Sequence, residues 1–173
     1  MSTLKSFTLK EVVEAPKAKV WEVLFTQFGE VHTHNPNLDS SHFMGQHSEG
    51  ALGCKRHCSI DGKTFVEEKI SKVEGSDSFE LTVTDSNFPM VKEMKARYEV
   101  HELSATKTEV ELTFLISTAP SFMVHIMKGQ MKKLINKYLI GLKYYLETGK
   151  EVSKDNFSTI AKAYKNLAPA ASF

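Results

Sequence analysis

The fold is decided by residues 120–149, PSFMVHIMKGQMKKLINKYLIGLKYYLETG. Apolar side chains recur in this stretch every three or four residues, at Met123, Met127, Met131, Leu134, Tyr138, Leu142 and Tyr145. That spacing predicts one long amphipathic helix. At ~1.5 Å per residue the helix would be roughly 40 Å long, so its apolar face needs an equally large apolar surface opposite it. The stripe is either ordinary core or, because methionine and tyrosine are adaptable and amphipathic, part of a cavity wall.

Length and composition are those of an ordinary one-domain globular protein. The chain has 173 residues, of which 41% are hydrophobic and 25% charged, and its formal net charge is +1. Its lysines are spread along the chain rather than clustered with aromatic residues, which disfavours a nucleic-acid partner. No segment reaches the ~18 uncharged apolar residues of a membrane span, and the first residues contain no apolar signal region. We therefore expect a cytoplasmic protein without a membrane span.

Two cysteines, Cys54 and Cys58, lie four residues apart in an expected strand. On one face of a strand they are about 13 Å apart, which is too far for a disulfide. We expect both to be buried thiols, as in proteins of a reducing compartment.

The remaining pattern predicts the sheet that the helix requires. Residues 5–13 alternate as a strand, and Pro16 then begins a helix that runs from Lys17 to Phe28 and stops at Gly29. A short helix or loop follows in residues 30–40. From Ser41 to Ser117, strands alternate with turn residues at intervals of about ten, and one face of each strand is apolar, as in an antiparallel meander.

We therefore predict an α+β fold in which a curved antiparallel sheet of about seven strands wraps a long C-terminal helix, in the order β-α-(α)-β6-α. Residues 150–173 predict a further short helix, capped by Ser153 or Asp155, with Leu167 on its apolar side and its end at Pro169.

Several short motifs resemble one superfamily. They are VVEAP followed by KAKVW (residues 12–21), His34-Asn35-Pro36, Gly53-x-x-Arg56, the Asp61-Gly62 turn followed by Glu68 and Ile70, Phe88-Pro89, and the closing helix. Together they are similar to the START-like helix-grip (SRPBCC) superfamily, and most to its polyketide cyclase/dehydrase-like branch, over residues 5–149. The resemblance implies a deep apolar cavity between sheet and helix. Members bind lipids, polyketides, plant hormones, sterol-like molecules or isoprenoids, and only some are enzymes.

The resemblance also divides the chain. Residues 1–149 are expected to form the helix-grip ligand-binding domain, and residues 150–173 a C-terminal extension that has no counterpart in the minimal fold.

Arg56 is the most informative polar residue, because it shares a strand face with Cys54, Cys58 and Ile60. A buried guanidinium must be paired. A three-residue hairpin loop places Arg56 opposite Glu68, whereas a two-residue loop places it opposite Glu67. The resemblance favours Glu68. The pair is either purely structural or an anchor or proton-transfer group for a ligand that carries an acid or a carbonyl.

Catalytic residues are unknown from the sequence, and the candidates are Arg56, Tyr98 and His34, with His34 or His32 as a general base at the cavity mouth. His32, His34 and His42 could in principle hold a metal, but no acidic or cysteine ligand lies at a recurrent metal spacing, so we expect no metal and no cofactor. The predicted ligand-binding residues share the apolar faces of sheet and helix: Arg56, Cys58, Glu68, Leu81, Val83, Asp85, Met94, Tyr98, Leu112, Phe114, Met123, Met127, Met131, Leu134 and Tyr138.

The first functional hypothesis is a monomer or homodimer that binds a small hydrophobic or amphipathic molecule, such as a lipid, polyketide or isoprenoid, in this cavity. The second is a cyclase or dehydratase, that is, a lyase or isomerase that uses acid–base groups in the same cavity. The third and weakest is a co-chaperone-like interaction module in which the apolar face is only core.

Overall fold

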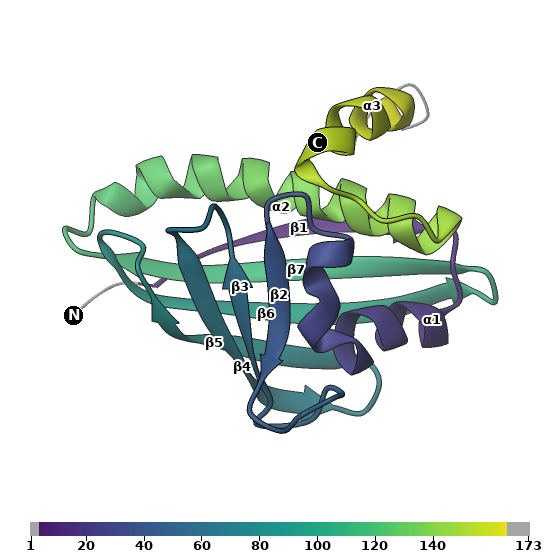
Figure 1. Ribbon diagram of the computed structural model, residues 1–173, viewed down its shortest axis with the longest axis horizontal. Helices are drawn as coiled ribbons and strands as arrows, with labels where there is room; N and C mark the ends of the chain where they lie inside the picture. The colour runs from purple at the N-terminus through teal and green to yellow at the C-terminus, as the bar shows by residue number, and fades with distance from the viewer. Residues whose placement is uncertain (1–3, 166–173) are drawn as a thin grey trace.

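The computed structural model describes residues 4–165, which form one curved sheet with helices on its concave side (Figure 1). The strands are β1 (Lys5–Val13), β2 (Ser40–Met44), β3 (Lys55–Ser59), β4 (Phe65–Glu74), β5 (Ser78–Ser86), β6 (Val91–Ser104) and β7 (Lys107–Thr118). They pair antiparallel throughout in the order β1-β7-β6-β5-β4-β3-β2. The predicted α+β fold class is confirmed.

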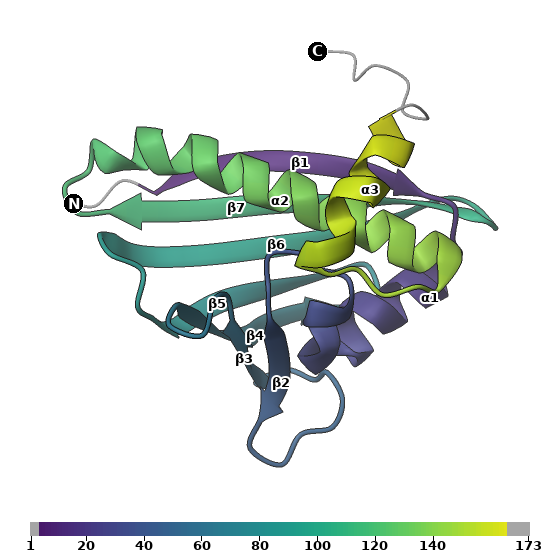
Figure 2. The same cartoon turned by 45° about the horizontal axis from the view of Figure 1, so that its top comes forward.

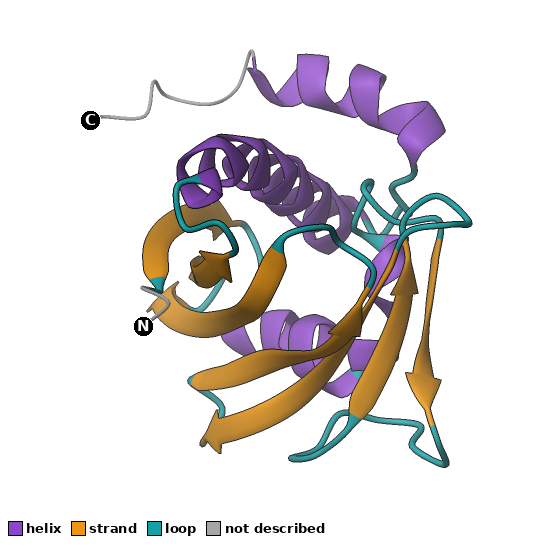
Figure 3. Ribbon diagram, turned by 90° about the vertical axis from the view of Figure 1, so that its left-hand side faces the viewer, coloured by secondary structure: helices purple, strands orange, loops and turns teal. Residues whose placement is uncertain are grey.

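The predicted closing helix is α2 (Met123–Thr148). It ends where Gly149 adopts a left-handed conformation (φ 70°) and donates its N–H to the Tyr145 carbonyl at 2.8 Å, a conformation that favours glycine. Its buried face packs on β1 and β7. Figure 3 shows the sheet curling around the space beneath α2. None of the helices in the described part of the chain is long and apolar enough to cross a membrane.

The prediction of a single regular helix from Lys17 to Phe28 is wrong. The segment is α1 (Lys17–Trp21), then a π-helical turn η1 (Glu22–Thr26), then a 3₁₀ segment η2 (Phe28–Thr33). Aromatic packing accompanies the irregularity, since Trp21 and Phe25 stack at 4.7 Å and both contact the ring of Phe79. This cluster, together with the C-terminal half of α2, fills one end of the concave face and leaves the other end for the site.

The C-terminal extension forms a helix that packs on the rest of the protein. Helix α3 (Lys154–Lys165) begins directly after Ser153, as predicted, and lies across the C-terminal half of α2 (Figure 2). The rings of Tyr144 and Tyr164 meet edge to face, and the Tyr164 hydroxyl donates to Glu147 at 2.8 Å. The expected contribution of Leu167 and the end at Pro169 lie outside the described residues.

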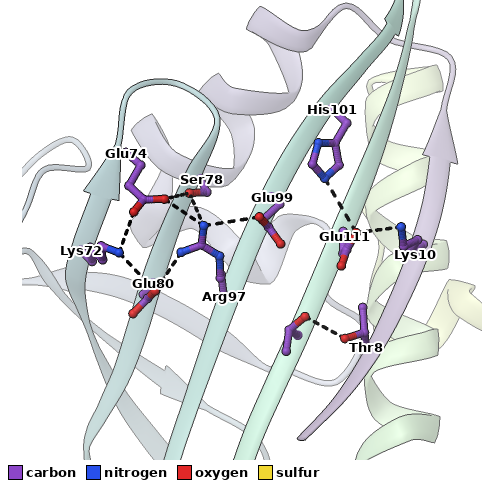
Figure 4. Close-up of polar contacts among 11 residues, drawn as sticks. Thr8, Lys10, Lys72, Glu74, Ser78, Glu80, Arg97, Glu99, His101 and Glu111 are labelled. Carbon is purple, nitrogen blue, oxygen red and sulfur yellow. Dashed lines mark hydrogen bonds and ion pairs between the residues drawn. The ribbon is translucent and has the colours of Figure 1, made fainter.

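Charged side chains on the convex face pair with one another (Figure 4). Arg97 donates to Glu74 at 2.9 Å and to Glu80 at 2.8 Å, and Glu111 pairs with Lys10 at 2.8 Å. These pairs neutralise each other's charge at the surface, where each contributes little to stability.

Candidate functional site

A cavity of about 460 Å³ lies between the concave face and the N-terminal half of α2. Its wall is mostly apolar, and it is formed by Val31, Asn35, Pro36, Asn37, Leu38, Arg56, Cys58, Ile60, Val66, Glu68, Phe88, Val91, Met94, Tyr98, Phe114, Ile116, Met127, Met131, Leu134, Ile135, Lys137, Tyr138 and Lys154. Arg56, Tyr98 and Tyr138 are buried, whereas Leu134 and Lys137 are exposed, so the cavity has a buried inner end and a rim at the surface.

Most of the predicted ligand-binding set lines this cavity: Arg56, Cys58, Glu68, Met94, Tyr98, Phe114, Met127, Met131, Leu134 and Tyr138. Leu81 and Leu112 are buried core residues away from the wall, at the end of the concave face that aromatic side chains fill. Val83 and Met123 are half-buried and also lie off the wall. Strand alternation identifies the buried face, but it does not say how far along that face the cavity extends.

The prediction that Asp85 lies on the apolar, ligand-binding face is wrong, because its side chain is exposed. The pairing of β4 with β5 shifts by one residue, so that Val83 lies opposite Glu68 but Asp85 lies opposite Glu67. The extra residue, Thr84, reverses the alternation beyond it. A bulge of this kind leaves no clear signal in the sequence.

The Arg56–Glu68 pair occupies the inner end of the cavity. β3 and β4 pair Arg56 directly with Glu68, which settles the register in favour of the three-residue loop. Glu68 Oε2 accepts a hydrogen bond from Arg56 Nε at 2.7 Å and lies 2.7 Å from Nη2 in the same ion pair, and Arg56 Nη1 donates to the Phe28 carbonyl at 3.0 Å. The guanidinium carbon also lies 4.1 Å from the centre of the Phe28 ring. The charge of the guanidinium is therefore balanced within the protein by Glu68.

Two tyrosine hydroxyls lie near this pair. The Tyr98 hydroxyl donates to that of Tyr138 at 3.5 Å, so strand β6 and helix α2 meet at the inner end of the cavity. Burial raises the pKa of Tyr98 and raises that of Tyr138 strongly, which keeps both hydroxyls protonated. Burial also raises the pKa of the Cys58 thiol to about 12. The inner end thus presents neutral donors beside an internally neutralised ion pair.

His34 is not at the cavity mouth, where it was expected as a general base. Its ring is buried in the core against the rings of Tyr138 and Tyr145, at 5.8 and 5.5 Å. Burial, and then the nearby Arg56 charge, lower its pKa to about 3. A base is most effective when its pKa is near the working pH, so this imidazole is poorly matched to that role. The loop is held against α2 at Gly141, where an added Cβ would lie 2.5 Å from the His34 carbonyl oxygen.

Loops supply wall residues that periodicity does not identify. Asn35, Pro36 and Phe88 belong to motifs that carried the family resemblance, but no alternation places their side chains in a cavity. Val66 and Ile116 also line the cavity, on the inward faces of β4 and β7, although the predicted ligand-binding set does not include them. Lys154 comes from the extension, which was assigned no role; at the rim it pairs with Asp39 at 2.5 Å.

The two cysteines are free and buried, as predicted. Among the described residues, Glu99, His101 and Glu111 lie close enough together to hold a cation. They are on the convex face, where Glu111 already pairs with Lys10 and His101 (Figure 4). Ion pairing accounts for this cluster without a metal.

By sequence, no protein-family model and no curated protein matches the chain. Solved structures are similar to it in fold. XoxI from Bacillus cereus aligns with a TM-score of 0.63 at 14% identity, over 82% of this chain and 94% of that chain. A protein from Nitrosospira multiformis gives 0.63 at 14%, over 84% and 98%, and Ara h 8.0201 gives 0.61 at 14%, over 83% and 98%. The chain has a helix-grip fold. At these identities the likeness extends to the fold alone.

Proposed function

We propose that this protein binds a small hydrophobic or amphipathic molecule in the cavity beneath α2. The cavity itself carries the proposal. Protein interiors contain few voids larger than a water molecule, whereas ligand pockets measure about 300–1,000 Å³. A space of about 460 Å³ with apolar walls and a few convergent polar groups belongs to the second class.

The polar groups of the inner end narrow the ligand chemistry. Arg56 and Glu68 neutralise each other, and the hydroxyls of Tyr98 and Tyr138 stay protonated. A carboxylate at this depth would meet no unpaired cation, whereas a carbonyl or hydroxyl would meet hydrogen-bond donors. We infer a ligand with a neutral acceptor at its inner end and hydrocarbon along its length, as in a lipid, polyketide or isoprenoid-like molecule. Lys137 at the rim would suit an acidic group at the outer end.

Two methionines on α2 provide a matched test. Met131 lines the cavity, whereas Met123 is half-buried on the same helix but off the wall. The freshly purified protein should carry a lipid-like mass in native mass spectrometry, and it should bind an uncharged fluorescent fatty-chain probe. Met131→Trp should lose both signals, because the indole fills the space, while Met123→Trp should keep them. Equal binding by the two variants, or no retained mass and no probe binding by the wild type, would contradict the proposal.

The same cavity suits a second function, a polyketide cyclase/dehydratase-type reaction. The observation in its favour is the pair of protonated hydroxyls, which could polarise a substrate carbonyl. Tyr98→Phe and Tyr138→Phe separate the two functions. A carrier should lose about five-fold in affinity for carbonyl-bearing ligands, because one hydrogen bond contributes about 1 kcal/mol. An enzyme should instead lose turnover with its binding largely kept.

The compartment is part of the proposal. Cys54 and Cys58 are free, buried thiols, which supports a reducing environment such as the cytoplasm.

A further inference from the structure

The N-terminal half of α2 carries exposed apolar side chains and exposed lysines. Phe122 is 64% exposed and Ile126, one helical turn later, is 56% exposed. The backbone of Met90, whose side chain is 49% exposed, lies beside the segment that leads into α2, because the Ala119 N–H donates to the Met90 carbonyl at 2.9 Å. We call Met90, Phe122, Ile126, Lys132 and Lys133 the α2 tip. Figure 3 looks onto this end of the molecule, where α2 begins.

The α2 tip is strongly basic although the whole protein is nearly neutral. Residues 112–146 contain no aspartate or glutamate. Of the lysines on α2, only Lys143 is ion-paired within the described part of the chain, with Glu11 at 3.5 Å and Glu147 at 3.1 Å. Lys132 and Lys133 are both exposed. Glu93, on strand β6, pairs with Lys95 at 2.7 Å. The positive charge of the tip therefore faces solvent.

In the part of the chain that the structure describes, the C-terminal half of α2, unlike its N-terminal half, is covered by another helix. α3 crosses the C-terminal half of α2, where Tyr144 packs against Tyr164 (Figure 2). Lys137 lies 6.0 Å from the ring centre of Phe157, at the border of the covered half. N-terminal to this border, Phe122 and Ile126 are exposed, and among residues 4–165 no helix packs over them.

We propose that the α2 tip docks on an anionic phospholipid bilayer. A helix with exposed apolar residues beside lysines is the arrangement that lies at a membrane interface, with its apolar side chains among the acyl chains and its lysines near the anionic headgroups. Charge complementarity favours this occupant over a second copy of the chain. A symmetric pair would place the lysines of one copy against those of the other.

Docking at the α2 tip would bring the cavity mouth to the bilayer. Leu134 lies on the cavity rim, 42% exposed, next in sequence to Lys133 of the tip. A hydrophobic ligand could then pass between the acyl chains and the cavity with little exposure to water. This purpose rests on the proposed function, whereas the docking itself does not.

Vesicle co-sedimentation of the full chain tests the docking. The protein should bind vesicles of phosphatidylcholine with about one third phosphatidylserine, and it should bind phosphatidylcholine alone much more weakly. Raising the salt from about 0.05 M to about 0.5 M should weaken the binding by screening the lysines. Lys132→Gln with Lys133→Gln should reduce the affinity about 25-fold, at about five-fold per lysine near the surface. Phe122→Ser with Ile126→Ser should reduce it at least ten-fold.

Matched controls come from other exposed residues. Lys55 and Lys69 are exposed and lie opposite each other on β3 and β4, so Lys55→Gln with Lys69→Gln removes the same charge from another surface. Leu52 and Leu103 are 67% and 55% exposed, and both can be changed to serine. These control variants should bind vesicles like the wild type. Equal losses in controls and tip variants would show non-specific attraction and overturn the proposal.

Two further outcomes would also overturn it. One is the absence of binding to the anionic vesicles. The other is self-association that Phe122→Ser with Ile126→Ser abolishes, measured by light scattering without vesicles, because the tip would then be a dimer interface. Probe binding in the cavity, measured on the same variants without vesicles, should stay unchanged. Failure of docking with intact probe binding would remove this inference and leave the proposed function standing.

Discussion

Breaking the Arg56–Glu68 pair should show whether it is worth more than a surface salt bridge. The two side chains are 6% and 14% exposed, and Glu68 Oε2 lies 2.7 Å from both Nε, which donates a hydrogen bond to it, and Nη2 of the guanidinium. Glu68→Leu would leave a buried cation with only the carbonyl and ring of Phe28 as partners. Removing one member of a buried pair costs about 3–5 kcal/mol, whereas an exposed pair contributes about 0–1 kcal/mol.

The two single variants should not be equal. A carboxylate left behind by Arg56→Met can take up a proton and become neutral, but a guanidinium left behind by Glu68→Leu stays charged at any accessible pH. Glu68→Leu should therefore destabilise the protein more than Arg56→Met. The double variant, Arg56→Met with Glu68→Leu, should recover most of the loss, because it leaves no unpaired buried charge.

Urea unfolding of the wild type, both single variants and the double variant measures this coupling as a double-mutant cycle. With a slope of about 1–3 kcal/mol per molar urea, a loss of about 4 kcal/mol shifts the midpoint by roughly 1.5–4 M. Losses below about 1 kcal/mol in each single variant, adding up in the double variant, would refute the reasoning. Probe binding by the double variant then separates the two roles: a structural pair can be replaced without losing the ligand, and an anchor cannot.

The remaining predictions concern the loop, the core histidine and the thiols. Gly141→Ala should lower the free energy of unfolding by about 1–3 kcal/mol, because the new Cβ meets the His34 carbonyl oxygen at 2.5 Å. Gly129 lies on the same helix with open space around it, so Gly129→Ala should raise the free energy of unfolding by about 1 kcal/mol in the same urea titration. The pKa of His34 is lowered from 6.5 to about 3, so on acidification the unfolded chain binds the proton before the folded protein does. The free energy of unfolding should therefore fall by up to about 1.4 kcal/mol per pH unit as the pH drops from 6.5 toward 3. His34→Leu should flatten this slope, and an unchanged slope would contradict the assignment. Cys54 and Cys58 are both buried, and burial raises the pKa of the Cys58 thiol. A thiol-specific reagent at about pH 8 should therefore label neither cysteine in the native protein and both after denaturation. Fast labelling of the native protein would show that the core opens.

The sequence alone determined the order of the main elements and, apart from the end of β5 beyond Thr84, which face of each strand is buried. Regular alternation in the strands and the three-to-four-residue spacing of residues 120–149 are local consequences of strand and helix geometry, so the sheet, α2 and its end at Gly149 could be predicted. The need for a partner for Arg56 followed from the cost of burying a charge, and turn geometry reduced the candidates to two adjacent glutamates.

Only the tertiary structure decided the rest, because it depends on contacts between residues distant in sequence. The bulge at Thr84 turned Asp85 outward, and the packing of α2 on the preceding loop buried His34. Aromatic side chains filled one end of the concave face. Leu81 and Leu112 are therefore core residues, whereas Met127 and Met131 line the cavity. Periodicity assigns a side chain to a face, but whether that face meets another side chain or empty space depends on what the rest of the chain places opposite it.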